Sequence, residues 1–283
     1  MKSVVVTKEE ELGIDSHFHI RDKLWKSIEV LIPKEKRKKK MGRKRMDDRK
    51  ALNAIFYVLR TGCQWKALPR SPGAPSTVHD RFQQWRDAGL FERLWKEGLL
   101  EYDARKGIDW EWQSMDCSIT KAPLGGKSTG PNPTDRAKSG TKRSLLVEGR
   151  GIPIGLAVDG ANRHDINAEK TLENIAIRRP DPDRIDQNIC LDKGYDFPEV
   201  DELVEDWGYT AHIARKGVDQ SKRKRIPRYR ARRWVVERTH SWMNRFRRLL
   251  IRWEKEENYV AMLHLACAWI TYHASGLFGY ALS

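Results

Sequence analysis

Three acidic residues, Asp116, Asp192 and Glu237, lie in segments whose patterns predict ordered structure and do not themselves call for an acid. Asp116 lies in a run that alternates its side chains with a period of two, which predicts a strand. Asp192 follows the apolar residues 189–191 and precedes a Lys-Gly break, so it marks the carboxyl end of a buried strand, where open α/β sheets place their ligands. Glu237 lies among arginines on a predicted helix.

Carboxylates from two strands and a later helix suggest a two-metal site for phosphoryl transfer. Mg²⁺ prefers oxygen ligands, and two such ions about 4 Å apart can hold both the attacking and the leaving oxygen of an in-line displacement. One carboxylate would then bridge the two ions. The alternatives are a surface strand acid for Asp116 and a turn or helix-cap residue for Asp192. For Glu237 the alternative is an ion pair with Arg233.

The predicted helix around Glu237 is amphipathic. An apolar stripe and a basic face both follow the helical period, so one side packs while the other presents cations around a single acid. Trp242 belongs to the stripe, which favours core packing over stacking on a flipped base. The stripe comprises Val235, Thr239, Trp242, Phe246, Leu249 and Trp253, and the other face comprises Arg230, Arg233, Glu237, Asn244 and Arg248.

Several longer segments occur in a characteristic order along the chain. They are GRKRMDDRKALNAIFYVLRTGCQW and STVHDRFQQW near the start, MDCSIT at Asp116, DRAKSGTKRSLLVEGRGIPIGLAVDGANRHD, CLDKGYD at Asp192, and RRWVVERTHSWMNRFRRL at Glu237. Together they resemble an insertion-sequence transposase of the DDE type, closest to the insertion-sequence-5 family, over about residues 41–250.

The resemblance implies a fold, a site and partners. The implied fold is α/β, with a ribonuclease H-like catalytic core of a mixed sheet flanked by helices. Asp116, Asp192 and Glu237 match the family's catalytic and metal-binding triad. The implied cofactor is Mg²⁺, as two ions for which Mn²⁺ substitutes. The implied partners are double-stranded DNA, as the element's inverted repeats and the target, and a second copy of the chain, because synapsis of two ends requires at least a dimer.

The Glu237 segment departs from the pattern of related transposases. Those often carry a tyrosine, an arginine three residues later, the glutamate four further and a lysine seven beyond it. Here Arg233 stands four before Glu237, but Tyr229 lies one residue too far from the arginine. Residue 244 is Asn, with Arg245 as the nearest basic residue. The 44 residues between the last two acids leave no room for a large inserted domain.

The middle of the chain supplies a sheet. Residues 145–147 and 152–158, turned through glycine, predict a hairpin that joins the strand at Asp116 in a set of three antiparallel strands. The polar stretch between residues 120 and 142 predicts a mobile loop near the site. The elements that follow are a helix from residue 166, the strand at Asp192, a helix over 199–207, a strand over 209–214 and the Glu237 helix. This order is the ribonuclease H-like order that the resemblance implies.

The first 105 residues are expected to form a helical DNA-binding region, and residues 106–283 the catalytic domain. One helix is predicted over residues 47–59, stopped at Thr61 and Gly62, and a second begins with Ser76 as its N-cap. The pair resembles a helix-turn-helix in a loose sense, with a longer link than usual. We expect this region to grip the terminal inverted repeats; packing of a helical prefix against the core is the alternative.

Positive charge gathers in two blocks. The chain has 54 Lys and Arg against 39 Asp and Glu, a net charge of +15. Residues 215–255 carry +13 and residues 34–50 carry +8, so the remainder is net acidic. Such concentration favours phosphate contacts, with solvated loops as the alternative. The candidate DNA contacts are Lys38, Lys39, Arg43, Lys44, Arg81, Lys138, Arg143, Arg230, Arg233, Arg245 and Arg248.

The four cysteines are widely spaced, which predicts small buried hydrophobic residues in a reducing compartment rather than zinc ligands or disulfides. Neither a signal peptide nor a transmembrane segment is predicted. No membrane partner is therefore expected, and the expected location is the prokaryotic cytoplasm, in association with the nucleoid.

Three functions are compatible with these features. The first is a DDE transposase that cleaves at element ends and joins the freed 3′-OH to target DNA. The second is a structure-specific nuclease on the same fold, without strand transfer. The third is a catalytically idle DNA-binding repressor, against which the three intact acids argue. A joining assay on element ends separates the first two.

Overall fold

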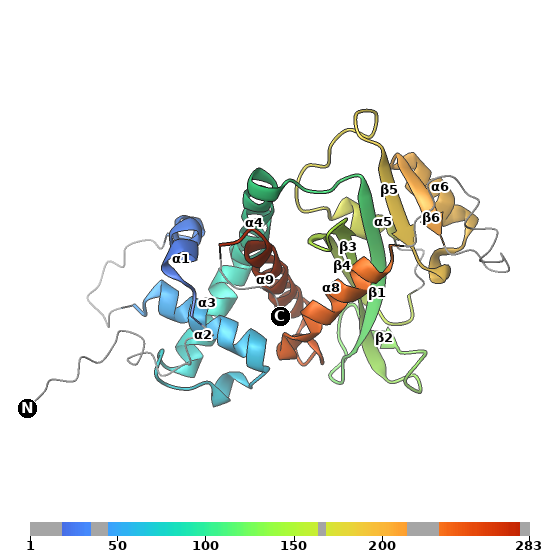
Figure 1. The fold of residues 1–283 in the computed structure, drawn as a ribbon. Helices are drawn as coiled ribbons and strands as arrows, with labels where there is room; N and C mark the ends of the chain where they lie inside the picture. Colours follow the sequence, from blue (N-terminus) through green and yellow to red (C-terminus); the bar gives the residue numbers. More distant parts are fainter. Residues whose placement is uncertain (1–18, 35–44, 164–167, 214–231, 278–283) are drawn as a thin grey trace, which may run out of the picture.

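The computed structural model describes residues 19–34, 45–163, 168–213 and 232–277. A group of helices lies on one side of the molecule and a twisted sheet on the other (Figure 1). The helices that precede the sheet are α1 (Asp22–Ile28), α2 (Asp48–Thr61), α3 (Pro75–Asp87) and α4 (Leu90–Lys106), with short 3-10 turns at η3 (Glu29–Leu31) and η4 (Trp65–Ala67).

The sheet is mixed. Its strands are β1 (Trp112–Lys121), β2 (Gly130–Pro131), β3 (Ser139–Glu148), β4 (Pro153–Gly160), β5 (Gln187–Leu191) and β6 (Tyr209–Ile213). β3 pairs antiparallel with β1, with β4 and with the short β2, whereas β1–β5 and β5–β6 are parallel pairs. The order β4-β3-β1-β5-β6 confirms the expected set of three antiparallel strands followed by two parallel ones.

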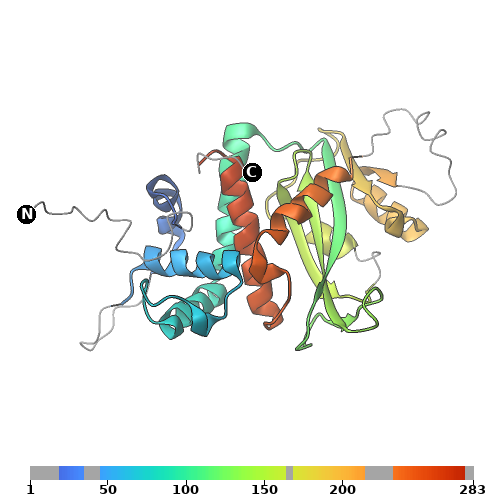
Figure 2. The same cartoon turned by 60° about the horizontal axis from the view of Figure 1, so that its bottom comes forward.

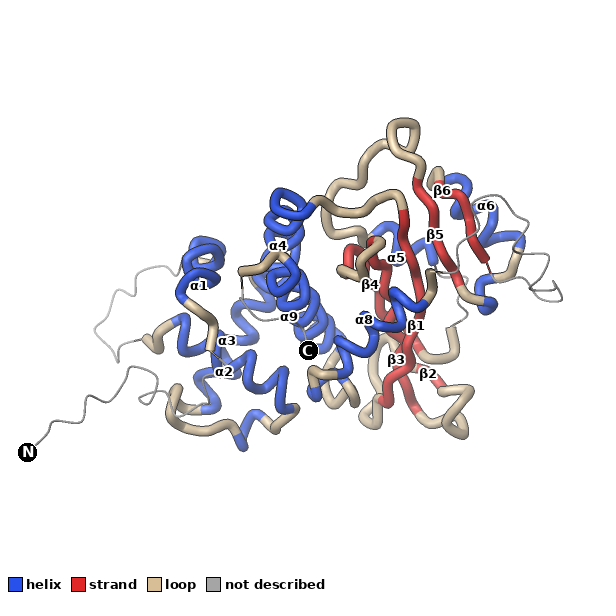
Figure 3. The backbone as a smooth tube through the Cα atoms, in the orientation of Figure 1, coloured by secondary structure: helices blue, strands red, loops and turns tan. Residues whose placement is uncertain are grey.

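Helices cover both faces of this sheet (Figure 3). Neighbouring residues of β3 point to opposite faces. Ser144 accepts a hydrogen bond from Thr171 of α5 (Ala168–Glu173), and Arg143 donates one to Asn244 of α8 (Trp234–Asn244), both at 2.7 Å. The helices α5 and α8 therefore lie on opposite sides, and α6 (Pro198–Asp206) links β5 to β6.

Two long helices that the sequence analysis did not predict join the helical group to the sheet. α4 and α9 (Glu256–Ala274) pack side by side (Figures 1 and 2). Gly89, with a left-handed φ of 67°, turns the chain from α3 into α4, so the helix predicted from Ser76 ends before this residue. Since α9 returns to α4, the buried apolar side chains on both sides of residue 105 form one continuous core.

The N-terminal helices follow the prediction in part. Asp47 caps α2 by accepting from the Lys50 N–H at 2.9 Å, and Gly62 ends the helix at a φ of 71°, as expected. The predicted cap at Ser76 is wrong. α3 begins at Pro75, whose fixed φ suits the first helical position and puts the cap one residue earlier, at Ala74.

The segment between β1 and β3 is shorter and better held than the expected mobile loop. β1 continues to Lys121 and β3 begins at Ser139, which leaves 17 residues between them, interrupted by β2. The buried Arg252 side chain ties this segment to the chain beyond α8. It donates to the carbonyls of Lys127 (2.7 Å) and Ser128 (3.0 Å) and, through Nε, to that of Glu254 (3.1 Å).

We expect Arg252→Met to lower the free energy of unfolding by about 2–4 kcal/mol, because it leaves several buried carbonyls without a donor. Urea denaturation followed by fluorescence measures this change. Arg184→Met, at an exposed arginine, is the matched control and should change stability by less than about 0.5 kcal/mol. A similar small change for both variants would contradict the role of Arg252 as a clasp.

The cysteines and the helices can be compared with the sequence expectations. The four cysteines are free; Cys190 and Cys267 are buried, whereas Cys63 and Cys117 are only partly so. The prediction of buried cysteines thus holds fully for two of them. Across the described part of the chain, none of the helices has the length and apolarity needed to cross a bilayer.

Candidate active site

The two aspartates lie where the sheet opens. Asp192 follows the last residue of β5, as predicted, and Asp116 lies in the middle of β1. The parallel ladder pairs Trp112 with Asn188 and ends where Ser114 pairs with Cys190. The same register carried two residues further sets Asp116 opposite Asp192. The carboxyl end of a parallel strand pair is a common place for ligands in α/β sheets.

The helix α8 brings Glu237 over this point. Its inner face is apolar, with Val235, Val236 and Met243 buried against the sheet, while Glu237 is exposed. His240 Nε2 lies 3.3 Å from the carbonyl oxygen of Asp116. Just before the helix, the Arg232 carbonyl accepts from Ser114 Oγ of β1 at 3.2 Å. These contacts fix α8 across β1, the strand that carries Asp116.

Each of the three carboxylates has a local hydrogen bond. Asp116 Oδ1 accepts from the N–H of Cys117 at 2.8 Å, and Asp192 Oδ1 accepts from the N–H of Gly194 at 2.6 Å. The second contact makes Asp192 the cap of the short 3-10 helix η5 (Lys193–Tyr195). Glu237 Oε1 pairs with Arg233 Nη2 at 2.7 Å. The cap and ion-pair alternatives considered for Asp192 and Glu237 are thus present in this conformation.

The electrostatics of Asp116 tie the three acids together. The pKa of its carboxyl is raised to about 6, first by burial and then by the charges of Asp192 and Glu237, against the lowering effects of its hydrogen bond from Cys117 and of Arg233. Protonation of Asp116 is therefore easier than for an ordinary aspartate, partly because two other carboxylates act on it electrostatically. A divalent cation would relieve the same repulsion.

The donor set suits a hard cation, because all three acids offer carboxylate oxygens. Within the described ranges, however, no three His, Cys, Asp or Glu side chains lie close enough together to hold one ion. The acids share an electrostatic field rather than a common coordination shell. For Glu237 to serve as a ligand, its carboxylate must leave Arg233 and turn toward the aspartates.

Two features of α8 were not anticipated: the buried side chain of His240 and the contact between Asn244 and Arg143. His240 lies on the buried face of α8, and burial together with the charge of Arg143 lowers its pKa to about 3, so it stays neutral. Asn244, which replaces the lysine of related transposases, accepts its hydrogen bond from Arg143. The only sequence signal for His240 was its place four residues after buried Val236, on the inner face of the helix.

The candidate DNA contacts divide into three groups. Lys138 and Arg245 are exposed, and Arg233 is partly exposed beside Glu237. Arg81, Arg143 and Arg248 are buried or nearly so. The remaining five, Lys38, Lys39, Arg43, Lys44 and Arg230, lie outside the described residues.

The three buried arginines correct the sequence expectation. Arg81 forms an ion pair with Asp48, which joins α3 to α2. Arg248 pairs with Glu254 and also donates to the carbonyl of Cys63 at 3.1 Å. Each guanidinium, including that of Arg143 on Asn244, has a partner inside the protein. A basic side chain on a helical face can equally serve packing between elements.

The apolar stripe of the Glu237 segment is interrupted. α8 ends at Asn244, and a 3-10 turn, η6 (Arg247–Leu249), follows, so the segment is not one continuous helix. Phe246 and Leu249 remain buried, but Trp253 is half exposed. Trp242 is partly buried and packs against the core, as expected, with the Arg238 guanidinium 4.9 Å from its ring centroid.

A mixed sheet in this order, with helices on both faces, has the ribonuclease H-like architecture. The chain belongs to the DDE transposases: residues 112–271 match the family described as "Transposase DDE domain". Residues 20–95 match the family "Putative transposase of IS4/5 family". The resemblance found in the sequence motifs is thereby confirmed.

Individual relatives agree with the family assignment. The chain is 34% identical over 154 residues to a protein of Burkholderia cepacia named "Putative transposase for insertion sequence element IS402", a match that covers 53% of this chain and 71% of the relative. It is 36% identical over 118 residues to the "Insertion element IS402 uncharacterized 16.2 kDa protein" of the same organism, covering 40% and 80%.

Solved structures show a more distant likeness. The pre-cleavage Mos1 transpososome matches with a TM-score of 0.27 and 12% identity, over 86% of this chain and 82% of that one. The catalytic domain of Mos1 mariner transposase matches with a TM-score of 0.28 and 13% identity, over 66% and 93%. The family assignment rests on the sequence matches, and the fold on the strand order described above.

Proposed function

We propose that this chain cleaves the phosphodiester at the inverted-repeat ends of an insertion sequence and joins the 3′-OH to target DNA. The observation that supports this most is the parallel register of β1 and β5, which, continued two residues beyond its last pair of Ser114 with Cys190, brings Asp116 level with Asp192. The helix that carries Glu237 packs across β1. Both steps are in-line displacements at phosphorus, so a single site can serve both. In this proposal the protein acts on DNA in the cytoplasm, at the nucleoid.

In this proposal, Asp116, Asp192 and Glu237 hold two Mg²⁺ ions, for which Mn²⁺ substitutes. When bound, these ions stabilise charge on the attacking and leaving oxygens. Asp116 and Asp192 are positioned by strands and need little movement, whereas Glu237 must exchange Arg233 for the ions. The released Arg233 guanidinium is then available to a DNA phosphate close to the reacting bond.

The proposed DNA path crosses the two candidate contacts whose side chains are exposed, Lys138 and Arg245. Arg245 follows the carboxyl end of α8, and Lys138 immediately precedes β3. Arg60 at the end of α2 lies close enough to Arg245 for their charges to repel, which lowers the pKa of Arg60 further than burial alone. Like charges brought together from two elements favour a phosphate between them. Synapsis of two ends further requires a homodimer in the reacting complex.

Neutralising the exposed cations should reduce the salt dependence of DNA binding. For Lys138→Gln with Arg245→Gln, we expect the log–log slope of affinity against salt to fall by about 0.9 for each phosphate that the protein no longer neutralises. Fluorescence anisotropy with a labelled duplex measures it. The control pair, Lys106→Gln with Arg184→Gln, removes exposed cations that precede β1 and β5, away from the carboxyl ends of those strands. Equal slopes for both pairs would remove Lys138 and Arg245 from the interface.

A joining assay tests the proposed function directly. The purified chain is mixed with Mg²⁺, labelled DNA that carries the inverted repeats flanking its gene, and a supercoiled target plasmid. We expect labelled ends to become covalently joined to the plasmid. Cleavage at the ends without joining would favour a structure-specific nuclease, and binding without cleavage would favour a DNA-binding repressor.

A further inference from the structure

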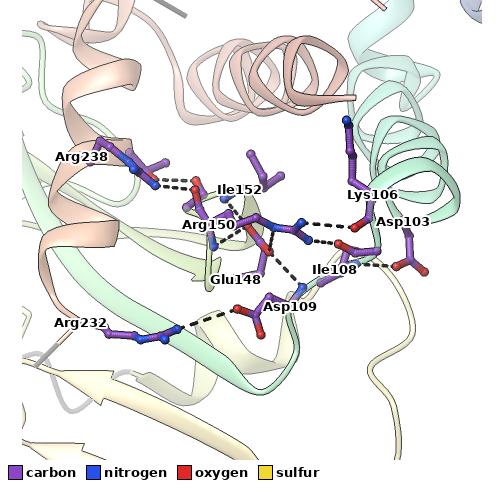
Figure 4. A network of polar contacts seen from close by, with 12 residues as sticks. Asp103, Lys106, Ile108, Asp109, Glu148, Arg150, Ile152, Arg232 and Arg238 are labelled. Atoms are coloured by element: carbon purple, nitrogen blue, oxygen red, sulfur yellow. Dashed lines mark hydrogen bonds and ion pairs between the residues drawn. The ribbon is translucent and has the colours of Figure 1, made fainter. Parts of the chain in front are cut away.

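The turn between β3 and β4, residues 148–152, is organised by a buried carboxylate. Glu148 has no exposed surface. Its Oε1 accepts from the N–H groups of Arg150 (2.9 Å) and Ile152 (3.1 Å), and its Oε2 accepts from the N–H of Asp109 (3.0 Å) (Figure 4). A buried acid is costly unless it is satisfied in this way. The contacts fix both the shape of the turn and its place beside the segment that leads into β1.

The helix α8 rests on the outer side of this turn, and these contacts are called the seat of α8. The carbonyl of Arg150 accepts from Arg238 Nη2, and the carbonyl of Gly151 accepts from Thr239 Oγ1, both at 2.6 Å. Arg238 and Thr239 are the two residues that follow Glu237. The position of the turn therefore sets how far α8 lies from the sheet at Arg238 and Thr239, directly after the proposed ligand Glu237.

Gly151 is the point of closest approach. Its φ of 88° lies in the left-handed region that favours glycine. A Cβ on this residue would lie 2.9 Å from Thr239 Oγ1, 3.1 Å from Arg238 Nη2 and 3.4 Å from Val235 Cγ1. A larger residue therefore displaces the Thr239 and Arg238 groups that bind this turn, pushes α8 outward or distorts the turn.

The same turn holds the end of α4 and the approach to β1. The Arg150 guanidinium donates to the carbonyls of Lys106 (3.2 Å) and Gly107 (Figure 4). Asp109, bound to Glu148 through its N–H, also lies 3.9 Å from the guanidinium of Arg232, just before α8. One buried carboxylate thus connects the two elements that carry Asp116 and Glu237.

We propose that Glu148 and Gly151 are positioning residues that set Glu237 relative to Asp116. The inference rests on the proposed function, since it takes both acids as ligands. It adds a cause for the geometry: the contacts with the turn locate the helix, because the Glu237 side chain is half exposed and pairs with Arg233 at the start of its own helix. A displacement of about 1 Å at a catalytic group can reduce a rate by about 10²-fold.

The test variant is Gly151→Ala, with Gly125→Ala as its matched control. Gly125 also has a left-handed φ, 62°, but a Cβ there meets nothing within 4 Å. For Gly151→Ala we expect Mn²⁺ binding, followed by the electron paramagnetic resonance of the free ion, to weaken by about tenfold, and end cleavage to fall by about 10²-fold. DNA binding should stay within a few-fold. The control should match the unaltered chain in all three.

Hydrogen exchange reports the seat of α8 without metal or DNA. In Gly151→Ala, the amides of α8 should exchange faster while those of β1 keep their protection. Glu148→Gln should act in the same direction. Unchanged α8 exchange in Gly151→Ala would overturn the inference. Absence of cleavage by the unaltered chain would instead contradict the proposed function. The exchange result would still decide whether the turn holds α8 in place.

Discussion

Asp116→Asn, Asp192→Asn and Glu237→Gln are each expected to abolish cleavage of element ends while leaving end binding within a few-fold. Each change removes one charged oxygen ligand and keeps the size of the side chain, so two ions can no longer be held for the in-line displacement. The loss should be at least about 10³-fold, comparable to the removal of one preorganised electrostatic group from an active site. Cleavage of labelled duplex and anisotropy of the same duplex measure the two effects.

The matched control is Glu169→Gln. This acid is exposed on α5, which lies on the opposite face of the sheet from α8, so its loss changes the net charge equally without touching the site. It should cleave like the unaltered chain. Retained cleavage in any one of the three site variants would remove that residue from the proposed ligand set.

Metal identity should matter most at Glu237. We expect cleavage with Mg²⁺ or Mn²⁺ but not with Ca²⁺, whose longer and more variable oxygen distances permit binding without aligning the attacking oxygen. Glu237→Asp draws the carboxylate back by one methylene. It should leave a trace of cleavage with Mn²⁺ and almost none with Mg²⁺, which demands near-ideal octahedral geometry. Single-turnover cleavage rates with each metal measure the difference.

The structure sharpens this expectation. Glu237 is the acid that must exchange an arginine for the ions, whereas Asp116 and Asp192 are held by their strands. Asp116→Glu should therefore be nearly inactive with either metal, because a longer side chain on a strand has no room to adjust. Equal activity of Glu237→Asp with both metals would mean that Glu237 is not a metal ligand and that its role is the ion pair with Arg233.

The sequence by itself determined the elements that carry the acids. A period of two around Asp116, an apolar run that stops at Asp192 and a helical stripe around Glu237 each report local burial, and local burial follows from residues that are close in the chain. The order of those elements, three strands, then helix and strand in alternation, gave the mixed sheet. The motifs gave the family.

The tertiary structure alone decided which cations face solvent. Arg143 is buried because Asn244 comes to meet it from a helix about one hundred residues later, and Arg81 because Asp48 lies on the preceding helix. A run of arginines reads the same in the sequence whether its partner is a phosphate or a distant side chain. The pairing of α4 with α9 could not be predicted for a similar reason. Because α9 is apolar nearly all round, its sequence does not show which face packs against which element.

The alignment of the acids is also a tertiary property. Each aspartate was predicted on its strand, but only the register between β1 and β5 sets Asp116 opposite Asp192, and register depends on contacts between strands far apart in the chain. Glu237 depends on a still more remote contact, the seat of α8 on the turn at Gly151. Sequence patterns report how residues are buried; distances between elements follow from how those buried surfaces fit together.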